Sequence, residues 1–494
     1  MSITDRRTLL QGAAALPLLA AGATTALAEG TEKPADNASA KPVQDKEPAR
    51  DVTRQLAHYI VNAGYGDLPA NVRKEGVRTL LNWVGVAIGG SHHQTVDIAV
   101  SALAPFSGPQ QASLFGRKER FDIMNAAFIN GVSSHIFDYD DTHLKTIIHP
   151  AGPVASAILA LSELQPVSGK EFLNALVLGV ETECRIGNSV YPNHYDVGWH
   201  ITGTAGVFGS AAAVGKLLKL NEQQMVWALG LAASQPVGLR ESFGSMNKSF
   251  NPGRAASNGI FAALLASKNY TSSDQMIEAK RGWANTISTK QDYNEILGGL
   301  GKRYEAALNT YKPFACGIVM HPAIDAAIQL RNENKLTADQ IDHIDLKVHP
   351  LVLELTGKKT PREGLEGKFS IYHAVAVALV EGAGGEKQFS DRAVTDPTVV
   401  ALRAKVNPVV TPGIKPEQVD LTVVLKDGRQ FNRHIAHAIG SVEVPMTDKQ
   451  LEAKFSDLAD GIIPAPAIRR VMDACWTIED LPSAAEIAKL SVSA

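Results

Sequence analysis

The 494-residue sequence predicts a mainly α-helical protein in which a smaller α+β domain is inserted into an all-helical domain. Three observations lead to this prediction. Apolar residues recur at helical spacing through the first half of the chain, the spacing becomes alternating after about Trp283, and helical spacing returns from Asp448. We expect the helical domain to comprise 51–285 and 443–494, and the α+β domain to comprise 286–442.

The helical domain is predicted by stripes of apolar residues at helical spacing. One stripe starts at Val72 and stops at Gly89-Gly90, because glycine often terminates a helix. The corresponding segments farther along the chain are 124–137, 154–164, 169–187, 202–220, 222–234 and 253–267. Many positions in these stripes are Ala or Gly, which lets neighbouring helices approach closely. The first half of the chain is therefore expected to form a compact helical domain.

The α+β domain is predicted by the change of pattern. Residues 341–348 alternate apolar and polar side chains with period two, as in a strand with one buried face. Residues 419–425 and 430–437 flank an Asp427-Gly428 turn and predict a β-hairpin. The helices expected beside these strands are 321–332 and 370–381, and those expected at the C-terminus are 451–458 and 467–474. We expect the C-terminal helices to pack back on the first domain, which makes the mixed unit an insertion.

The N-terminus is predicted to be a targeting segment. The Arg6-Arg7 pair precedes a modestly apolar run that ends in the small-residue triplet Ala26-Leu27-Ala28. An ordinary amphipathic helix is the alternative, but Pro17 interrupts the run. We therefore expect a twin-arginine signal peptide at 1–28, a flexible leader at 29–50, and a periplasmic protein without a membrane anchor after signal cleavage.

The composition excludes several classes of protein. An apolar fraction of 45% is enough to bury a core, so general disorder is excluded. The 48 Lys and Arg are balanced by 51 Asp and Glu, and a formal charge of −3 argues against a nucleic-acid partner. Cys184, Cys316 and Cys475 are far apart and odd in number, so they encode neither a disulfide framework nor an iron–sulfur cluster.

The densest group of chemically active side chains spans 135–149. Its carboxylates and imidazoles are Asp138, Asp140, Asp141, His135, His143 and His149. Like charges this close together raise some carboxylate pKa values, which suits acid–base catalysis. A zinc or hard-metal site is a second interpretation, and solvated or helix-capping aspartates are a third. Residue types alone leave all three open.

A second segment, 238–254, is rich in Gly, Ser and Asn and contains Arg240, Lys248 and Arg254. We expect Asn251-Pro252 to cap the following helix, with the proline at its first position. Cations and free N–H groups at a helix N-terminus outline an anion site. A basic surface loop without a ligand would have the same composition.

Two further candidates are weaker. Cys316 lies shortly before His321, but a Cys–His nucleophile pair needs an orienting partner, and the sequence nearby offers none. His200, taken alone, is more typical of a hydrogen-bonded packing residue than of a catalytic group. Buried structural thiols are the preferred interpretation of the cysteines.

Several motifs, taken in their order along the chain, resemble the MmgE/PrpD family from about 51 to 481. They are Phe137-Asp138-Tyr139-Asp140-Asp141-Thr142-His143 with His149-Pro150, His200-Ile201-Thr202-Gly203-Thr204-Ala205-Gly206, Met246-Asn247-Lys248 with Gly253-Arg254-Ala255-Ala256, and Lys368-Phe369-Ser370. The family includes 2-methylcitrate dehydratase, cis-aconitate decarboxylase and iminodisuccinate epimerase. The resemblance implies a mainly α fold with an inserted α+β lid domain, a homodimer, and a site between the domains that needs no metal or organic cofactor.

Carried over residue by residue, the resemblance assigns the site to Asp138, Thr142, His149, His200 and Lys248. Members of the family build up enolate-like charge beside a carboxylate, so a base and cations must meet at that carbon. We interpret His149 as the proton-transfer residue, with Asp138 and Lys248 as further catalytic groups. Thr142 and His200 are interpreted as substrate-binding groups.

Two positions depart from the family's pattern. The family often has a tyrosine shortly after the Phe-Ser of the lid motif, whereas here His373 holds that place and Tyr372 lies one position earlier. A histidine that often follows the family's lysine is replaced by Asn251. We include His373 as a catalytic group, because imidazole titrates near neutral pH. Tyr372 and Arg254 are included as substrate-binding groups.

These assignments predict a cofactor-independent lyase that acts on a small di- or tricarboxylate by proton transfer next to a carboxylate. Dehydration of a 2-methylcitrate-like hydroxy acid is the first expectation. Epimerisation, isomerisation or decarboxylation at the same site is the alternative among enzymes. A periplasmic carboxylate-binding protein without turnover is the alternative from another class, but binding alone would not need a proton-transfer residue such as His149.

Overall fold

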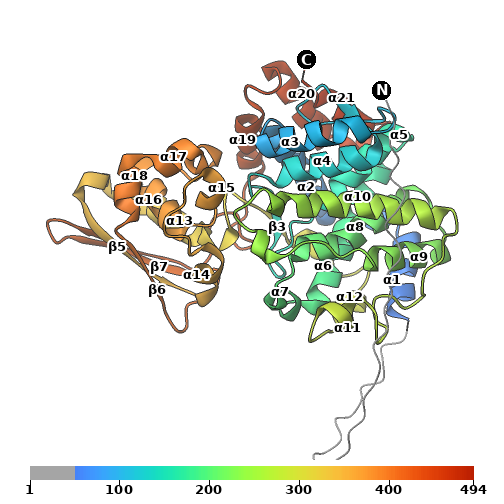
Figure 1. Ribbon diagram of the computed structural model, residues 1–494, viewed down its shortest axis with the longest axis horizontal. Helices are drawn as coiled ribbons and strands as arrows, with labels where there is room; N and C mark the ends of the chain where they lie inside the picture. Colours follow the sequence, from blue (N-terminus) through green and yellow to red (C-terminus); the bar gives the residue numbers. More distant parts are fainter. Residues whose placement is uncertain (1–50, 494) are drawn as a thin grey trace, which may run out of the picture. The chain divides into compact units, whose positions relative to one another are not determined.

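The computed structural model describes residues 51–493, which are drawn in colour in Figure 1. The predicted signal peptide at 1–28 and leader at 29–50 lie outside the described residues. Between 51 and 493, no helix has both the length and the hydrophobicity needed to cross a lipid bilayer. The fold is mainly α-helical with small β-sheets, as the sequence predicts.

The first part of the chain is helical, and we call it, together with the C-terminal helices, the helical part. Its helices are α1 (Val52–Asn62), α2 (Ala70–Gly90), α3 (Gln94–Leu103), α4 (Ile123–His135), α5 (Ala151–Leu164), α6 (Gly169–Val190), α7 (Asn193–Val197), α8 (Ile201–Leu217), α9 (Glu222–Ala233), α10 (Asn247–Ser267), α11 (Trp283–Ile287) and α12 (Asn294–Leu297). Helix α10 packs against α4 and α8 (Figure 1). Glycine permits this approach, since a Cβ at Gly131 of α4 would lie 2.6 Å from the Cα of Gly253 in α10.

The start of α10 corrects one prediction. The sequence predicts Asn251 as the cap and Pro252 as the first helical residue, but α10 begins at Asn247 and Pro252 lies inside it. The amide of Asn251 lies 2.8 Å from Nδ1 of His200, so this side chain binds a neighbouring residue and does not cap the helix. A proline removes one helical hydrogen bond, and packing of a buried helix offsets that loss.

Residues 317–440 form what we call the α+β part. Its sheet has the order β6-β5-β7-β8, with strands β5 (Ile341–Val348), β6 (Val406–Val410), β7 (Val419–Leu425) and β8 (Gln430–Ile435). Strand β5 is parallel to β6 and antiparallel to β7, and β7 and β8 form the predicted hairpin. The helices are α13 (His321–Asn334), α14 (Pro350–Thr356), α15 (Gly364–Gly367), α16 (Ile371–Glu381), α17 (Asp391–Thr395) and α18 (Pro397–Arg403). Helices α13 and α16 contact the strands and share an apolar core with the buried side chains of β5 and β7 (Figure 1).

The C-terminal helices pack on the helical part. They are α19 (Asp448–Ala459), α20 (Ala465–Trp476) and α21 (Ala485–Leu490). Helices α19 and α20 both contact α2, and a Cβ at Gly85 of α2 would lie 2.9 Å from the ring of Phe455 in α19. Phe455 and Trp83 belong to one apolar core.

Two short strands bring distant segments together. Strand β3 (Asp141–His143) pairs in antiparallel register with β4 (Asn309–Tyr311), so Asp141 lies opposite Tyr311. The residues that follow α4 therefore lie beside the residues that lead into the α+β part. A further two-stranded pair is β1 (Ala112–Ser113) with β2 (Arg120–Phe121).

Candidate active site

Helices α5, α8 and α10 begin around one buried cavity, and α4 ends beside it. Asp138 follows α4, and Lys248 lies in the first turn of α10. His149 precedes the start of α5, and His200 is the N-cap residue of α8. These side chains and that of Lys312 line a cavity of about 30 Å³. Helix N-termini carry free N–H groups and partial positive charge, so the arrangement favours an anion.

Asp138 lies between two ammonium groups. Its Oδ1 accepts hydrogen bonds from Nζ of Lys248 at 2.8 Å and from Nζ of Lys312 at 2.7 Å. Burial alone would raise the pKa of Asp138, but the two ammonium groups outweigh burial and hold the pKa well below its usual range. Asp138 also has φ 50°, a left-handed conformation that costs a non-glycine residue free energy and that clusters at functional sites. The two lysines together supply more positive charge than Asp138 neutralises.

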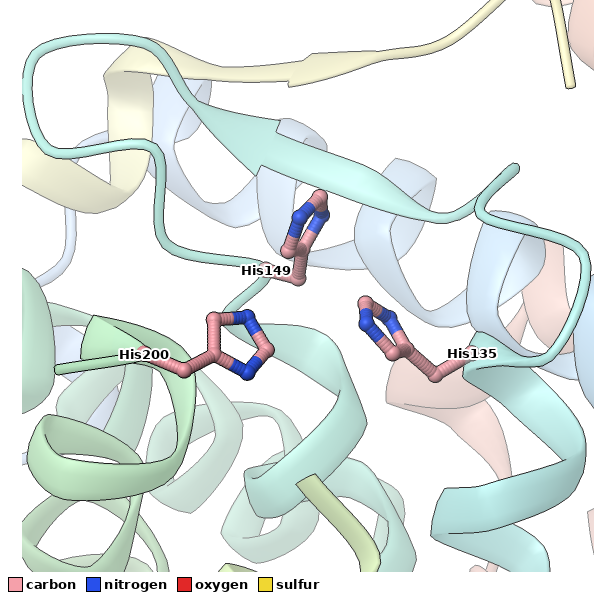
Figure 2. Close-up of side chains that lie close together, drawn as sticks. All are labelled: His135, His149 and His200. Atoms are coloured by element: carbon pink, nitrogen blue, oxygen red, sulfur yellow. The ribbon is translucent and has the colours of Figure 1, made fainter. Parts of the chain in front are cut away.

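Three imidazole rings face one another in the same place, as Figure 2 shows. The ring centroid of His135 lies 4.7 Å from that of His149 and 5.9 Å from that of His200. Burial lowers the pKa of all three rings, and the nearby ammonium of Lys248 lowers it further. The rings are therefore neutral near pH 7, and each has one unprotonated nitrogen.

The contacts of His149 decide which of its nitrogens is unprotonated. Its Nδ1 lies 2.8 Å from the carbonyl oxygen of Asp141 and 3.3 Å from Oγ1 of Thr142. A carbonyl accepts and cannot donate, so Nδ1 carries the proton. The lone pair is then on Nε2, which lies 4.0 Å from Oδ1 of Asp138. A neutral imidazole with this orientation is suited to act as a general base.

The other two rings are oriented by different partners. Nδ1 of His200 accepts a hydrogen bond from the amide of Asn251 at 2.8 Å, so its Nε2 carries the proton and is a donor for a carboxylate. Nδ1 of His135 lies 2.6 Å from Oδ2 of Asp140, and its Nε2 lies 2.9 Å from Nζ of Lys248. Burial lowers the pKa of Lys248, and the charge of Lys312 adds to this effect. Lys248 is thus a buried ammonium whose proton is easier to transfer than usual.

The same imidazoles are close enough to hold a metal ion. One nitrogen from each of His135, His149 and His200 lies within 4.8 Å of the others. However, Nε2 of His135 already accepts from Lys248, and Nδ1 of His200 accepts from Asn251. Asp138 and Asp140 form a second such group with His135 and His149. But Oδ1 of Asp138 already accepts from the ammonium groups of Lys248 and Lys312, which also repel a cation. The donor set therefore fits an anionic substrate better than a divalent metal.

Two models of protein-family domains match most of the chain. The models of the MmgE/PrpD N-terminal domain and the MmgE/PrpD C-terminal domain match residues 54–296 and 314–478. The chain belongs to the MmgE/PrpD family. This finding agrees with the resemblance seen in the sequence motifs.

The curated MmgE/PrpD relatives are similar to this chain at low identity over long alignments. Cis-aconitate decarboxylase-like protein oryM of Aspergillus oryzae is 26% identical over 476 residues, which cover 91% of this chain and 98% of the relative. Human cis-aconitate decarboxylase is 26% identical over 452 residues, covering 87% of this chain and 92% of the relative. The 2-methylcitrate dehydratase of Cupriavidus necator is 24% identical over 383 residues, covering 70% and 75%. By name, these relatives are decarboxylases and a dehydratase.

Most of the residues assigned from the MmgE/PrpD resemblance lie together. Asp138, His149, His200 and Lys248 line the cavity. Thr142 lies behind it, fully buried in β3, with its hydroxyl 3.3 Å from Nδ1 of His149. Thr142 therefore contacts the imidazole and is not part of the cavity wall in the described structure, so a role in orienting His149 suits it better than substrate binding.

The structure does not bring Arg254, Tyr372 and His373 to the cavity, which none of them lines in the described chain. Arg254 is exposed on α10 and lies 3.4 Å from the hydroxyl of Ser257. His373 is buried in the α+β part, where its Nε2 contacts the carbonyl of Gln388 at 2.9 Å. Tyr372 is half-buried on the same helix, α16.

Lys312 is a site residue to which the sequence pattern gave no role, although it begins the segment that contains Cys316 and His321. Its Nζ contacts the side chain and the carbonyl oxygen of Asp138. Lys312 reaches Asp138 because β3 pairs with β4. This pairing joins positions about 170 residues apart, and no local sequence pattern predicts it. Nearby, burial raises the pKa of the Cys316 thiol, so the structure gives no support to a Cys–His nucleophile pair.

Lys454 of α19 supports this arrangement from behind. Its Nζ donates to the carbonyl oxygens of Tyr139 and Lys312 and to the side chain of Asn82. It therefore ties the residue after Asp138 to the backbone of Lys312. Burial lowers the pKa of Lys454 to about 7.

Proposed function

We propose that the protein is a lyase that acts on a small di- or tricarboxylate through an enolate-like intermediate. The observation that carries this proposal is the meeting of two lysine ammonium groups with neutral, oriented imidazoles in one buried cavity. Ammonium groups and N–H donors hold carboxylates and receive the charge that develops beside them. The lone pair on Nε2 of His149 is a base for a neighbouring carbon–hydrogen bond.

Loss of carbon dioxide from an unsaturated tricarboxylate is the first candidate reaction. The bond to the departing carboxylate breaks, and its electron pair spreads into the adjoining double bond and carboxylate as a dienolate. Carbon dioxide leaves, and a proton from the Lys248 ammonium completes the product at carbon. These reaction steps need no oxidant. Relatives named cis-aconitate decarboxylase support it, because two of them align with 87% of this chain.

Dehydration of a hydroxytricarboxylate is the second candidate. His149 takes a proton from the carbon next to a carboxylate, and the carbon–oxygen bond then breaks as Lys248 protonates the departing hydroxyl. Relatives named 2-methylcitrate dehydratase support this reaction over 70% and 74% of this chain. Neutral His149 and protonated Lys248 provide the base and the acid that this reaction needs.

Proton NMR in D₂O tests the proposal. Purified protein is incubated with cis-aconitate, citrate, 2-methylcitrate and their amino and hydroxy analogues. Loss of carbon dioxide from an unsaturated acid, with deuterium at a saturated carbon, is expected for the first reaction. A vinyl signal that appears from a saturated hydroxy acid without loss of carbon dioxide is expected for the second. A protein that binds these acids without any turnover would contradict the proposal and support the binding-protein alternative.

Export and assembly are proposed from the sequence. We propose a periplasmic location by the twin-arginine route and a homodimer in solution. Cell fractionation of the full chain and light scattering of the purified protein test these two proposals. A cytoplasmic monomer would contradict both without bearing on the chemistry.

A further inference from the structure

A second, larger cavity adjoins the candidate active site. Its volume is about 510 Å³, and it shares Ile147, Ile318 and Val319 with the lining of the site cavity. These three side chains line both cavities, and we call them the partition. Ile147 comes from the loop after β3, whereas Ile318 and Val319 come from the segment before α13. The larger cavity thus lies beside the loop that leads from β3 to His149.

The lining of this cavity is mostly apolar, and its polar members include the buried His143 and His321 and the exposed side chains of the outer rim. The buried and half-buried side chains include Leu144, Tyr191, Leu308, Pro322, Leu351 and Ala438. The charged side chains of Lys145, Glu417 and Glu443 are exposed. His321 also lines the cavity, where its ring is buried. Burial and the charge of Lys312 lower the pKa of His321 to about 3, so the ring is uncharged and adds no charge to the wall.

The partition includes a strained residue. Ile147 has φ 58°, which is rare for a β-branched side chain. Its loop is anchored because Nε2 of His143 lies 3.0 Å from Glu305 and Nζ of Lys145 lies 3.2 Å from the same carboxylate. Such strain persists only where the surroundings hold it, and it clusters at ligand sites. The fold therefore holds Ile147 at the boundary between the two cavities.

The other neighbour of the site cavity has the opposite chemistry. Beyond Phe243 and Leu355 lies a cleft lined by Arg240, Glu354 and Lys358. A ligand in the site thus has polar surroundings on one side and apolar surroundings on the other. The site cavity itself, at about 30 Å³, holds about one water molecule and is too small for a tricarboxylate. A substrate must occupy neighbouring space as well.

We propose that the substrate carries an alkyl chain, which passes between the side chains of Ile147, Ile318 and Val319 that line both cavities and occupies the larger apolar cavity. The inference rests on the proposed function and narrows its substrate class to di- or tricarboxylates whose alkyl chain is longer than a methyl group, because the second cavity of about 510 Å³ is far larger than a methyl group. The carboxylates lie at Lys248 and Lys312, and the chain points away from them. Burial of the chain then supplies binding free energy that an unsubstituted acid lacks.

Binding of unreactive alkylsuccinates to the full-length protein tests this inference. Succinate and its 2-methyl, 2-butyl and 2-hexyl derivatives are titrated by calorimetry. Each buried methylene is expected to tighten binding about fourfold. A dissociation constant that does not change with chain length would overturn the inference while leaving the proposed function intact. Failure of succinate and every derivative to bind would instead contradict the carboxylate site itself.

Variants of the larger cavity locate the chain. Leu351→Trp fills the cavity, so the ratio of the dissociation constants of succinate and 2-hexylsuccinate should fall towards one. Leu164→Trp, on the exposed end of α5, is the matched control and should keep the full ratio. Ile439→Trp fills the same cavity from another segment and replaces Leu351→Trp if that variant does not fold. A ratio that survives both substitutions, or a loss of dimers in light scattering without a change in the ratio, would overturn the inference.

Discussion

The two walls of the candidate active site carry different kinds of groups. The helical wall presents the ionisable side chains Asp138, His149, His200 and Lys248. The wall from the α+β part consists of Gly317, Ile318, Val319, Leu355, Thr356 and Phe369, none of which is ionisable. Lys312 lies at the junction, directly after β4. The contrast indicates that one part of the chain supplies the chemistry and the other shapes the space around it.

The α+β wall nevertheless affects the chemistry of the helical wall. Nζ of Lys248 lies 5.7 Å from the ring centroid of Phe369 in the α+β part, and 5.3 Å from that of Phe243 in the loop before α10. Aromatic faces attract an ammonium while they exclude water from it. Burial is also the largest cause of the lowered pKa of His149 and His200. The α+β part thus places an aromatic ring near Lys248 and supplies no ionisable group of its own to the cavity lining.

Substitution of His149 tests the contrast most strongly. His149→Asn keeps a donor for the carbonyl of Asp141 but removes the base, so kcat for dehydration of a hydroxytricarboxylate should fall roughly 10²–10⁴-fold. Tyr372→Phe in the α+β part is the control and should leave kcat close to wild type. Steady-state kinetics on the substrate found by NMR gives both values. Normal dehydration by His149→Asn would refute its role as the base, and a large loss in Tyr372→Phe would move chemistry to the other wall.

Substitution of Lys312 tests the junction between the walls. Lys312→Met removes one of the two donors to Asp138 and one cation that receives developing charge, so kcat should fall about 10²–10³-fold. Lys358→Met removes an exposed lysine of the neighbouring cleft and should keep kcat near wild type. Stopped assays and thermal unfolding of both variants separate lost catalysis from lost folding. Equal kcat values for the two variants would show that Lys312 only supports the fold.

His373 should affect stability where His149 affects rate. Burial lowers the pKa of His373 to about 4 from an ordinary value of 6.5. Between these pH values the unfolded ring binds a proton that the folded ring does not, so the free energy of unfolding falls as the pH falls through this window. The contribution of this one ring is at most about 3 kcal/mol.

His373→Asn removes that contribution. The difference in free energy of unfolding between wild type and variant should therefore shrink as the pH is lowered from 7 to 4.5, as measured by urea unfolding. The other buried histidines are present in both proteins and cancel in the difference. A difference that is independent of pH would contradict the lowered pKa, and a large loss of kcat in His373→Asn would restore it as a catalytic group.

The fold could be predicted from the sequence because its helices carry apolar stripes and its strands alternate. The start of α10 could not, because Asn251-Pro252 has the signature of a helix start while packing extends the helix by another turn. This error also explains why Arg254 was wrongly expected beside Lys248 at the site. Lys248 and Arg254 are six residues apart on one continuous helix of about 3.6 residues per turn, so they point to different faces.

The site could be predicted only in part for a related reason. Asp138, His149, His200 and Lys248 were found through motifs, and each lies next to the end or the start of a helix. Lys312 reaches Asp138 through the pairing of β3 with β4, and no local pattern reports such a long-range contact. The larger apolar cavity is lined by residues from several segments that lie far apart in the sequence, so no single stretch of the chain predicts it.

The ion pair between Arg240 and Glu354 joins the two walls outside the cavity and gives the smallest expected effect. Arg240 belongs to the loop before α10, and Glu354 belongs to α14 of the α+β part. Glu354 is exposed, and such pairs contribute roughly 0.2–1 kcal/mol. Glu354→Gln should therefore change KM by less than about fivefold and leave kcat unchanged, because the pair holds the walls together without touching the reacting groups.

Glu241→Gln is the matched control, since Glu241 lines the same cleft and is exposed. Both variants remove one negative charge beside Arg240, but the bridge to α14 is lost in Glu354→Gln alone. A larger change of KM in Glu354→Gln than in Glu241→Gln, which disappears at high salt where the wild-type pair is screened, would identify the bridge as the cause. Equal changes in the two variants would mean that the cleft acts on an anionic substrate through its total charge, and the walls would then be held together by their apolar contacts.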